Sequence, residues 1–537
     1  MKLTVVYEDV AVGAREAFVA TATGQNSLAN INLLKADNPP RDYMNPGELN
    51  NVLLDGTGYV YPADLSTCIP VMSTAISDDS GALEESIVIT LTADGNFSSQ
   101  GITLVFSEVV GRYPKSVKIQ WYNNSELLYD KTYTPDSPNY YCEQYVDSYN
   151  KLVITLTGVN MPQNYLTLNN VICGLIRQFS RPDIETFTLL HDIDPVSSTL
   201  KIDTMDFSLK QKTDIEYVFQ DKQAIKSYFD DELMSTTFVK KYSRNSRDSY
   251  EIATEDYMGL LDDVQFYGGM YTNKSLTELI AEILEPVGVP YTIADNLTDK
   301  TLTGYISVCT RREALTQVMF AIGAVADTSY SDKVDIYTLS DEIAAVLNDN
   351  NTFTGQQTKT TDKITELRLY AYSYVESSNT YTAYQAAKSG TGTDIEVIFP
   401  EPLYDLSITN GTISESGTNY AIITANTNCV LTGKKYDKTQ SATIIRNPNI
   451  LAGDKENIYE ITNFTLVNRD NVEELAQACF DYYSHRENIN ETILASDIKV
   501  GDMVTQKYSY RDNITGRVST MKYTVSGAAK VADVTIT

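Results

Sequence analysis

The chain has 537 residues, of which 42% are hydrophobic, and a formal net charge of −29 at pH 7. A single hydrophobic core stops growing at roughly 250–300 residues, so this length predicts several domains. Because phosphate backbones and anionic lipid headgroups repel so acidic a surface, the composition argues against sequence-specific binding to nucleic acid.

The cysteines and the hydrophobic runs exclude further classes of protein. The six cysteines lie far apart and include no CxxC pair, so the sequence predicts neither a zinc site nor a redox motif. The first residues lack the long apolar core of a signal peptide, and no run approaches the ~20 apolar residues that span a bilayer. We therefore expect a chain that is assembled in a cytoplasm and carries no membrane anchor.

The first segment, up to about residue 178, is predicted to consist of short β-strands. In residues 87–92, Ile87, Ile89 and Leu91 alternate with less apolar residues, a pattern that we interpret as a strand buried on both faces. Further candidate strands are 102–106, 117–121, 151–156 and 165–173. Several short strands at such intervals favour a sandwich or jelly roll.

Tyrosines gather around the single tryptophan of this segment. Tyr122, Tyr133, Tyr140 and Tyr141 are candidates for aromatic side chains that face a glycan. The simpler interpretation is structural, since Trp121 ends an apolar strand and such residues more often lie in a core.

Residues 175–186 break the β pattern at Pro182 and are predicted to be a boundary or short linker. Residues 187–264 predict a β-barrel-like module, with candidate strands at 214–219, 234–244 and 249–256. A local basic cluster in this module consists of Lys240, Lys241, Arg244 and Arg247. No Gly-rich loop accompanies the cluster, so a solvated turn or a subunit contact is favoured over a phosphate site.

Two helices are predicted next, each from a capping-box spacing at its N-terminus. Ser275 with Glu278, and Thr310 with Glu313, have the spacing in which two side chains satisfy backbone donors of the first turn. The first helix is expected to end before Pro286. The predicted apolar faces consist of Leu276, Leu279, Ile280, Ile283 and Leu284 in the first helix, and Leu315, Val318, Met319 and Ile322 in the second.

After residue 340 the composition shifts toward Thr, Asn, Gly and Tyr. Candidate strands are 364–375, 394–408, 419–426, 429–436 and 441–447, with a hairpin tip at 433–435. A third helix is expected to start at Asp470, with Glu473 completing a capping box. A closing β unit is predicted from strands at 501–504, 518–527 and 531–537.

Four strings carry a resemblance to a known family. They are LHDIDPVSSTLKIDTMDFSL, YEIATEDYMGLLDDVQFYGGMY, TGYISVCTRREALTQVMFAIGAVADTSYSDKVDIYTL and GDMVTQKYSYRDNITGRVSTMKYTVSG. In order and spacing they resemble the tail-hub proteins of bacteriophages and prophages of Gram-positive bacteria, which are similar to the trimeric baseplate hub of contractile tails. The resemblance covers about the last two thirds of the chain. It implies an architecture, with two related barrels per subunit around a central channel, and no active-site residues.

A second resemblance concerns the first segment. The strings NVLLDGTGYVYP, GITLVFS, YPKSVKIQWY and KLVITLTGVNMPQNYLTL occur in this order. They are similar to the galactose-binding-like jelly-roll domains at the N-termini of such tail proteins. Relatives of this fold bind sugars and a calcium ion, but Asp78 and Asp79 lack a recognisable calcium-loop spacing, so we assign no metal ligand.

The sequence offers no catalytic constellation. His191 and His485 are the two histidines, and each is more simply a structural or surface residue than a base. No nucleophile elbow, HExxH or CxxC motif is present, and nothing in the spacing of the acidic residues selects a glycosidase pair. We expect no enzyme activity, no cofactor and no metal.

The predicted fold class is mainly β with α+β parts: an N-terminal jelly-roll sandwich followed by hub-type β-barrel modules with packed helices. The predicted domains are 1–178 (galactose-binding-like jelly roll), 179–264 (first hub barrel), 265–340 (α/β module with two capped helices), 341–465 (β-rich module) and 466–537 (helix and second hub barrel).

The resemblance implies a structural virion protein at the tail tip or baseplate. Such a hub subunit joins a sixfold tail tube to threefold tip parts and lines the DNA ejection channel. The implied partners are two further copies of the chain, distal tail and tube proteins, the tape-measure protein, and tail spike or receptor-binding proteins. The alternative is an adhesin that binds host cell-wall carbohydrate through the jelly roll, and an endolysin-like enzyme is a weaker third possibility.

Overall fold

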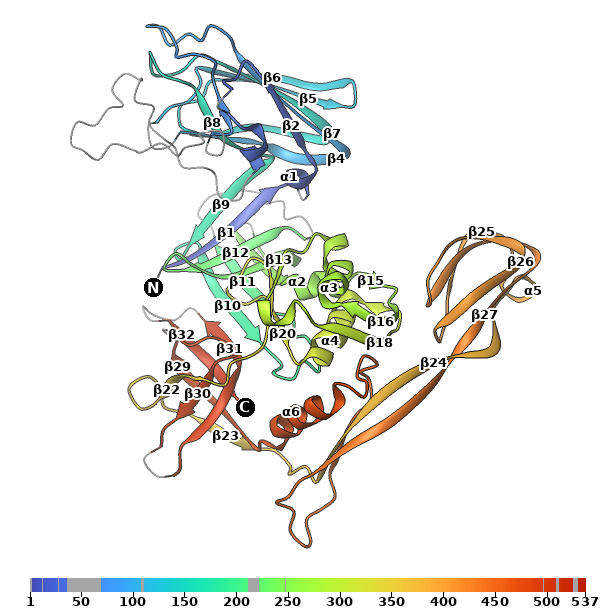
Figure 1. Ribbon diagram of the computed structural model, residues 1–537. Coiled ribbons are helices and arrows are strands. Elements are labelled where there is room, and N and C mark those ends of the chain that lie inside the picture. Colours follow the sequence, from blue (N-terminus) through green and yellow to red (C-terminus); the bar gives the residue numbers. More distant parts are fainter. Residues whose placement is uncertain are drawn as a thin grey trace. The chain divides into compact units, whose positions relative to one another are not determined.

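The computed structural model describes residues 2–11, 13–27, 29–35, 69–107, 111–210, 222–246, 248–495, 497–508, 511–524 and 530–537. Strands make up 55% of it and helices 12%, which confirms the mainly-β class with helical parts. Val6–Gln178 form one compact unit, the N-terminal unit, and most of the chain from Phe179 to Thr537 forms a second, the C-terminal unit (Figure 1). The predicted division into five domains is finer than these two units and stays a prediction.

The N-terminal unit is built on a seven-stranded sheet. Its strands lie in the order β3-β8-β4-β7-β5-β6, and β2 pairs with β4. Their bounds are β2 Val19–Thr23, β3 Val71–Met72, β4 Ile87–Phe106, β5 Ser116–Asn123, β6 Glu126–Tyr133, β7 Asn139–Thr157 and β8 Thr167–Ile172, with short helical turns at α1 Ala14–Ala17 and η1 Ile31–Lys35. The predicted strands at 102–106, 117–121 and 151–156 all lie within these elements. The jelly-roll assignment stays a prediction.

Burial in β4 corrects one expectation. Ile87, Ile89 and Leu91 are buried, but Val88 and Thr90 between them are only half-buried. The strand therefore buries one face in the core of the unit, because side chains alternate between the two faces of a sheet. The expectation of burial on both faces was wrong.

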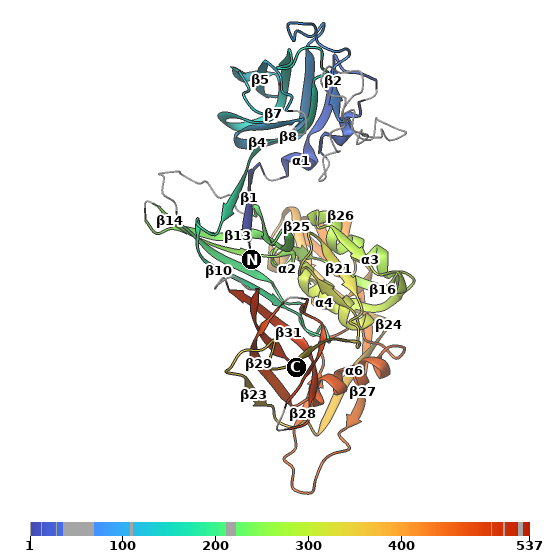
Figure 2. The ribbon, with the colours of Figure 1, turned by 90° about the vertical axis from the view of Figure 1, so that its left-hand side faces the viewer.

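The largest sheet of the C-terminal unit has the order β23-β29-β32-β31-β10-β11-β14-β13-β12, with β22 and β30 attached beside β31 and with β1 and β9 after β12 (Figure 2). The bounds are β1 Leu3–Val10, β9 Gly174–Ser180, β10 Ile184–Asp192, β11 Thr204–Lys210, β12 Ala224–Phe229, β13 Glu232–Arg244, β14 Ser249–Glu255, β22 Ile343–Leu347, β23 Gln357–Thr360, β29 Glu487–Leu494, β30 Met503–Gln506, β31 Ile514–Thr524 and β32 Val531–Ile536. Thr188 of β10 pairs with Thr524 of β31. Strands from 187–264 and from 497–537 thus share one sheet. The predicted strand at 214–219 lies outside the described residues.

The predicted linker at 175–186 is mostly strand. β9 continues to Ser180 and β10 begins at Ile184, so only three residues form the turn between them. The Asp183 carboxylate holds this turn by accepting a hydrogen bond from the Ser180 amide at 3.1 Å. Pro182 marks a tight turn, where we had predicted a longer break.

An α/β module follows within the C-terminal unit. It contains α2 Tyr257–Asp262, β15 Gln265–Phe266, β16 Gly269–Ser275, α3 Leu276–Leu284, β17 Tyr291–Ile293, β18 Thr301–Ile306, β19 Cys309–Thr310, α4 Arg311–Ile322, β20 Val325–Asp327 and β21 Val334–Tyr337. The predicted apolar faces of both helices are buried in one core. The Thr310 capping box is confirmed: the Glu313 amide donates to Thr310 Oγ1 at 3.2 Å, and the Thr310 amide donates to Glu313 Oε2 at 2.9 Å.

Two other capping boxes were wrong. At Ser275 the hydroxyl pairs with Thr277 Oγ1 at 2.8 Å, while the Glu278 carboxylate is drawn to the Lys274 ammonium at 3.0 Å. Both side chains therefore have partners other than the backbone donors of the first turn. The third helix, α6 Val472–Ser484, begins after Asn471, with no side-chain cap at its start.

The remaining strands form an arm of five strands. They are β24 Glu366–Gln385, β25 Gly392–Ile398, β26 Leu403–Ser416, β27 Tyr420–Arg446 and β28 Ile458–Ile461, with the short helix α5 Ala386–Ser389. At the base of the arm, Leu367 and Leu369 of β24 pack with Phe480 of α6. Farther out, β25, β26, α5 and the adjoining ends of β24 and β27 form what we name the distal lobe, which has a core of its own (Figure 1).

The length of β27 corrects the predicted hairpin. Residues 419–447 were predicted to hold three strands with a tip at 433–435, but β27 runs through all of them for 27 residues. Gly433 pairs with Tyr381 inside the ribbon of β24 and β27. A Cβ on Gly433 would lie 2.7 Å from Leu406 Cδ2, so this glycine permits close packing and makes no turn.

No helix among the described residues is long and apolar enough to cross a membrane.

Candidate functional site

The aromatic residues predicted to face a glycan are largely withdrawn from solvent. Trp121 is fully buried in the core of the N-terminal unit, as its position at the end of an apolar strand predicted. Tyr133 is also buried, and its hydroxyl donates to the backbone carbonyl of Glu143 at 3.1 Å. Burial raises the pKa of Tyr133 above its ordinary value. The half-buried Tyr140 packs edge-on against it, with the ring centroids 6.5 Å apart.

Of the other two candidates, Tyr141 follows Tyr140 in β7, and Tyr122 lies elsewhere on the sheet. In the β5–β6 hairpin, Val117 pairs with Tyr133 at one end and Tyr122 pairs with Leu127 at the other. Tyr122 and Tyr141 are both half-buried. The structure thus brings Tyr133 and Tyr140 together and places Tyr122 apart from them. Their role toward a glycan stays a prediction.

The N-terminal unit exposes two other tyrosines. The side chain of Tyr129, on the edge strand β6, is 46% exposed, and that of Tyr145 in β7 is 54% exposed. Tyr145 is one of the tyrosines that gather around Trp121 in the sequence, whereas sequence reasoning passed over Tyr129. The missed signal is the composition of β6, which contains the charged residues Glu126, Asp130 and Lys131, as is typical of an edge strand.

Asp78 and Asp79 serve a turn. Asp78 Oδ1 accepts hydrogen bonds from the amides of Ser80 and Ala82, each at 2.8 Å. The hydrogen bond from the Ser80 hydroxyl is the largest of the effects that hold the pKa of Asp78 below its ordinary value. Asp79 accepts from Gln163 Nε2 at 2.5 Å. Within the described ranges, no group of three or more His, Cys, Asp or Glu side chains is placed to hold a metal ion.

The predicted basic cluster has little uncompensated charge at its centre. The Lys240 ammonium lies 2.9 Å from Glu255 and 3.7 Å from Asp263. The Arg244 guanidinium lies over the Tyr250 ring, 5.3 Å from its centroid. Lys241 is exposed, and Arg247 lies outside the described residues. An ion-paired strand end fits this arrangement better than an anion site.

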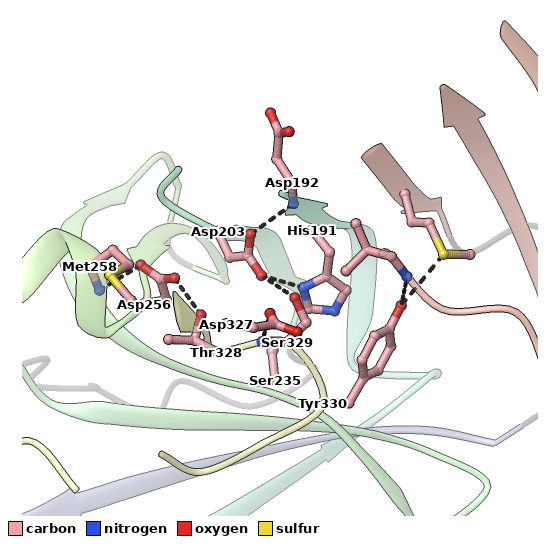
Figure 3. A network of polar contacts seen from close by, with 12 residues as sticks. His191, Asp192, Asp203, Ser235, Asp256, Met258, Asp327, Thr328, Ser329 and Tyr330 are labelled. Atoms are coloured by element: carbon pink, nitrogen blue, oxygen red, sulfur yellow. Dashed lines mark hydrogen bonds and ion pairs between the residues drawn. The ribbon is translucent and has the colours of Figure 1, made fainter. Parts of the chain in front are cut away.

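A buried polar network lies in the C-terminal unit around His191 (Figure 3). His191, in β10, is fully buried, and its Nδ1 lies 2.5 Å from Asp203 Oδ2. The Ser329 hydroxyl donates to the same oxygen at 2.9 Å, and the Asp192 amide donates to the other oxygen at 2.9 Å. One buried carboxylate therefore ties β10 to the segment after β20.

Two more buried carboxylates extend the network. Asp256 caps α2 by accepting from the Met258 amide at 3.0 Å, and it accepts from the Thr328 hydroxyl at 2.5 Å. Asp327 accepts from the Tyr337 hydroxyl at 2.9 Å. Burial, reinforced by the charge of Asp203, raises the pKa of Asp256 to about 8 and raises that of Asp327 above its ordinary value. Burial therefore favours the protonated form of Asp256.

The network contains the residue types of a nucleophilic site but not its arrangement. An activated serine donates to the imidazole, and the imidazole in turn pairs with the carboxylate. Here Ser329 and His191 both bond to Asp203. This geometry positions the segments that it joins. Sequence reasoning identified His191 as structural and missed Asp203 and Asp256. The position of Asp256 directly before α2 is a signal for a helix cap that could have found it.

A large cleft lies between the arm and the α/β module, and we name it the arm cleft. Its volume is about 760 Å³. Tyr305 and Arg312 line it from the module, Tyr374 and Tyr436 from β24 and β27, and Pro400 from the distal lobe. The rings of Tyr305 and Tyr374 approach to 5.4 Å between centroids.

No protein-family model matches the sequence, and no curated protein matches it. Among solved structures, the chain is similar to the tail protein from Neisseria meningitidis MC58, with 10% identity, 67% of this chain and 93% of that chain covered, and a TM-score of 0.43.

Two further structures are similar at the same level. The 43 kDa tail protein of prophage MuSo2 from Shewanella oneidensis matches with 11% identity, 68% of this chain and 95% of that chain covered, and a TM-score of 0.42. Prophage tail protein gp18 from Listeria monocytogenes EGD-e matches with 10% identity, 66% and 91% covered, and a TM-score of 0.39. Matches with such TM-scores carry no argument about the function of this chain.

Proposed function

We propose that the chain is a structural subunit of the tail tip or baseplate of a phage or phage-derived particle. Three copies form a hub that joins a sixfold tail tube to threefold tip parts and lines the channel for DNA ejection. The observation that carries this proposal is the order and spacing of the four strings in the sequence. The described parts of all four strings belong to the C-terminal unit.

The pairing of β10 with β31 supports the proposal. The first and the last of the four strings each contribute to the two strands that pair, with Leu190 opposite Lys522. Strands of the two candidate barrels, in 179–264 and in 466–537, therefore meet in one hydrogen-bonded sheet. A continuous sheet resists shear better than separate modules and suits the wall of a channel.

The charge of the chain fits the same role. Lys and Arg number 42 against 71 Asp and Glu, and an acidic wall does not retain a DNA backbone that must pass it. In this proposal the chain is part of the virion, contacts distal tail, tube, tape-measure and spike proteins, and catalyses no reaction.

Stoichiometry in purified particles tests the proposal. Quantitative mass spectrometry of tails, with the tube protein as reference, should give three copies of this chain per tail tip. A structure of the tip should show β10 and β31 nearer to the axis than the N-terminal unit. Six or twelve copies, or a lumen built mainly by the N-terminal unit, would exclude the hub.

Carbohydrate binding by the N-terminal unit is the second candidate. The exposure of Tyr129 and Tyr145 favours it, because exposed aromatic rings can stack on sugars. Saturable binding of the full chain to host cell walls, lost in a Y129A/Y145A variant and retained in a Y242A variant of the C-terminal unit, is the expected result. Equal binding by all three proteins would contradict this candidate.

A further inference from the structure

The distal lobe has a hydrophobic core separate from that of the rest of the C-terminal unit. The core consists of Tyr384, Ala386, Val397, Phe399, Leu403, Ala421, Ile423, Ala425, Cys429 and Leu431. None of these residues belongs to the core of the α/β module or to the core at the base of the arm. The lobe can therefore move as a body without exposing either of those cores.

The ribbon that carries the lobe has exposed side chains on both of its strands. Val375 of β24 is 60% exposed, and its partner across the ribbon, Asp437 of β27, is also exposed. Tyr374, next to Val375, packs on Tyr305 of the module, and the ribbon continues beyond this contact toward the lobe. A two-stranded ribbon is only marginally stable, so we expect this stretch to bend more readily than the sheets at its two ends.

A bulge interrupts the ribbon beside the lobe. Glu376 pairs with Tyr436 and the next pair is Thr380 with Lys434, so β24 advances four residues while β27 advances two. Residues 377–379 thus face the single residue Lys435. Such a bulge removes ladder hydrogen bonds and bends the strand locally.

The lobe touches the module through a small polar contact, which we name the clasp. Asn419, fully buried, donates from Nδ2 to the carbonyl of Tyr267 at 2.6 Å and to that of Ile306 at 2.8 Å. The rings of Tyr420 and Tyr267 stack with centroids 4.0 Å apart, and the Tyr267 hydroxyl donates to Glu396 at 2.5 Å.

One more bond completes the clasp. The Met270 amide donates to Thr418 Oγ1 at 3.1 Å. Over the described part of the chain, the hydrogen bonds between the lobe and the module are those made by Thr418, Asn419 and Glu396. Water can replace polar bonds of this kind when the two surfaces separate. Beside the clasp, the arm cleft lies between the distal lobe and the α/β module.

We propose that the distal lobe is a movable strap that pivots at the bulge of residues 377–379 and is held closed over the arm cleft by the clasp. In the closed state Asn419 bridges two backbone carbonyls of the module. In the open state water replaces Asn419 at the two carbonyls. The lobe keeps its own core, and the arm cleft widens.

Distance measurement by pulsed electron paramagnetic resonance tests the strap in the full chain. Spin labels at D299C in the module and T412C in the lobe report the separation, since both positions are exposed and outside the clasp. The background carries C309S, because Cys309 is only half-buried, and C68S, because Cys68 lies outside the described residues; the other four cysteines are buried. We expect one main distance in this background and a several-fold larger population of longer distances after Asn419→Ala.

Ser414→Ala is the matched control. Its hydroxyl bonds to the Ile422 carbonyl at 3.0 Å within the lobe, so this variant loses a hydrogen bond without touching the clasp. The distance distribution should not change. Equal broadening in S414A and N419A would overturn the proposal.

Tyr267→Phe is a second clasp variant, and it tests the strap even if N419A unfolds the lobe. Tyr267 belongs to the module, and phenylalanine keeps the stacked ring while it removes the bond to Glu396. We expect a smaller shift in the same direction as in N419A. An unchanged distribution in both clasp variants would show that the lobe is fixed by other contacts and would refute the strap.

Discussion

At the scale of single residues, Asp256 couples the stability of the C-terminal unit to pH. Its folded pKa of about 8 lies above the ordinary value of 3.8, so the folded state binds the proton more tightly than the unfolded state. This contribution is fully present below about pH 4 and is lost as pH rises to about 8. The loss is on the order of a few kcal/mol, since one pKa unit corresponds to about 1.4 kcal/mol.

Asp256→Asn should remove most of this dependence. The asparagine oxygen can still accept from the Met258 and Gly259 amides, and the side chain carries no charge at any pH. Calorimetry at pH 5 and pH 8 should show a smaller fall in the unfolding temperature for D256N than for the parent. The exposed Asp299→Asn is the control. An undiminished fall in D256N would contradict the assignment.

His191 and Ser329 should differ in their cost when each is removed. His191→Ala leaves a buried carboxylate without its imidazole partner and opens a cavity, which costs about 3–5 kcal/mol. Ser329→Ala removes one bond to the same carboxylate, at about 1–2 kcal/mol. Calorimetry should rank the variants in this order. Fluorescence of Trp121, in the N-terminal unit, provides an internal reference that we expect to remain unchanged; the reverse ranking would contradict the geometry.

At the scale of elements, the two capping boxes predicted for α3 and α4 differ in their outcome. Thr310→Ala should cost about 1 kcal/mol, because its hydroxyl accepts from the Glu313 amide. Ser275→Ala should cost only a few tenths, because Ser275 makes no side-chain bond to the helix backbone. Hydrogen exchange at the first amides of each helix checks this. A larger increase in the exchange rate of α3 in Ser275→Ala than of α4 in Thr310→Ala would contradict this prediction.

The sequence predicts elements well where local chemistry decides them. The apolar faces of α3 and α4, the Thr310 cap and the burial of Trp121 follow from spacing alone. It fails where partners distant in the chain decide. The sequence around Gly433 suggests a turn, but the glycine lies within β27, where a Cβ would come too close to the side chain of Leu406. Asp203 joins the His191 network only because the fold brings β10, α2 and β20 together, and no local pattern encodes that meeting.

At the scale of the whole molecule, the charge of −29 gives a direct prediction. The chain should not retard duplex DNA in a gel at low salt, where electrostatic attraction to a phosphate backbone is strongest. Electrophoretic mobility at about 50 mM salt checks this. Retardation that weakens steeply with added salt would reveal a basic surface and would count against a channel that DNA passes freely.

The pairing of Thr188 with Thr524 also determines when the sheet can form during synthesis of the chain. β10 leaves the ribosome long before β31, so one edge of β10 has no strand partner until β31 has been synthesised. Closing so long a loop is slow, and an unpaired strand edge recruits other chains. A chain ending at residue 500 should therefore aggregate, as light scattering after expression would show, and a soluble product would contradict this. In the cell, the nascent chain keeps this edge of β10 unpaired while all the residues between β10 and β31 are synthesised, and during that time the edge is open to pairing with other chains.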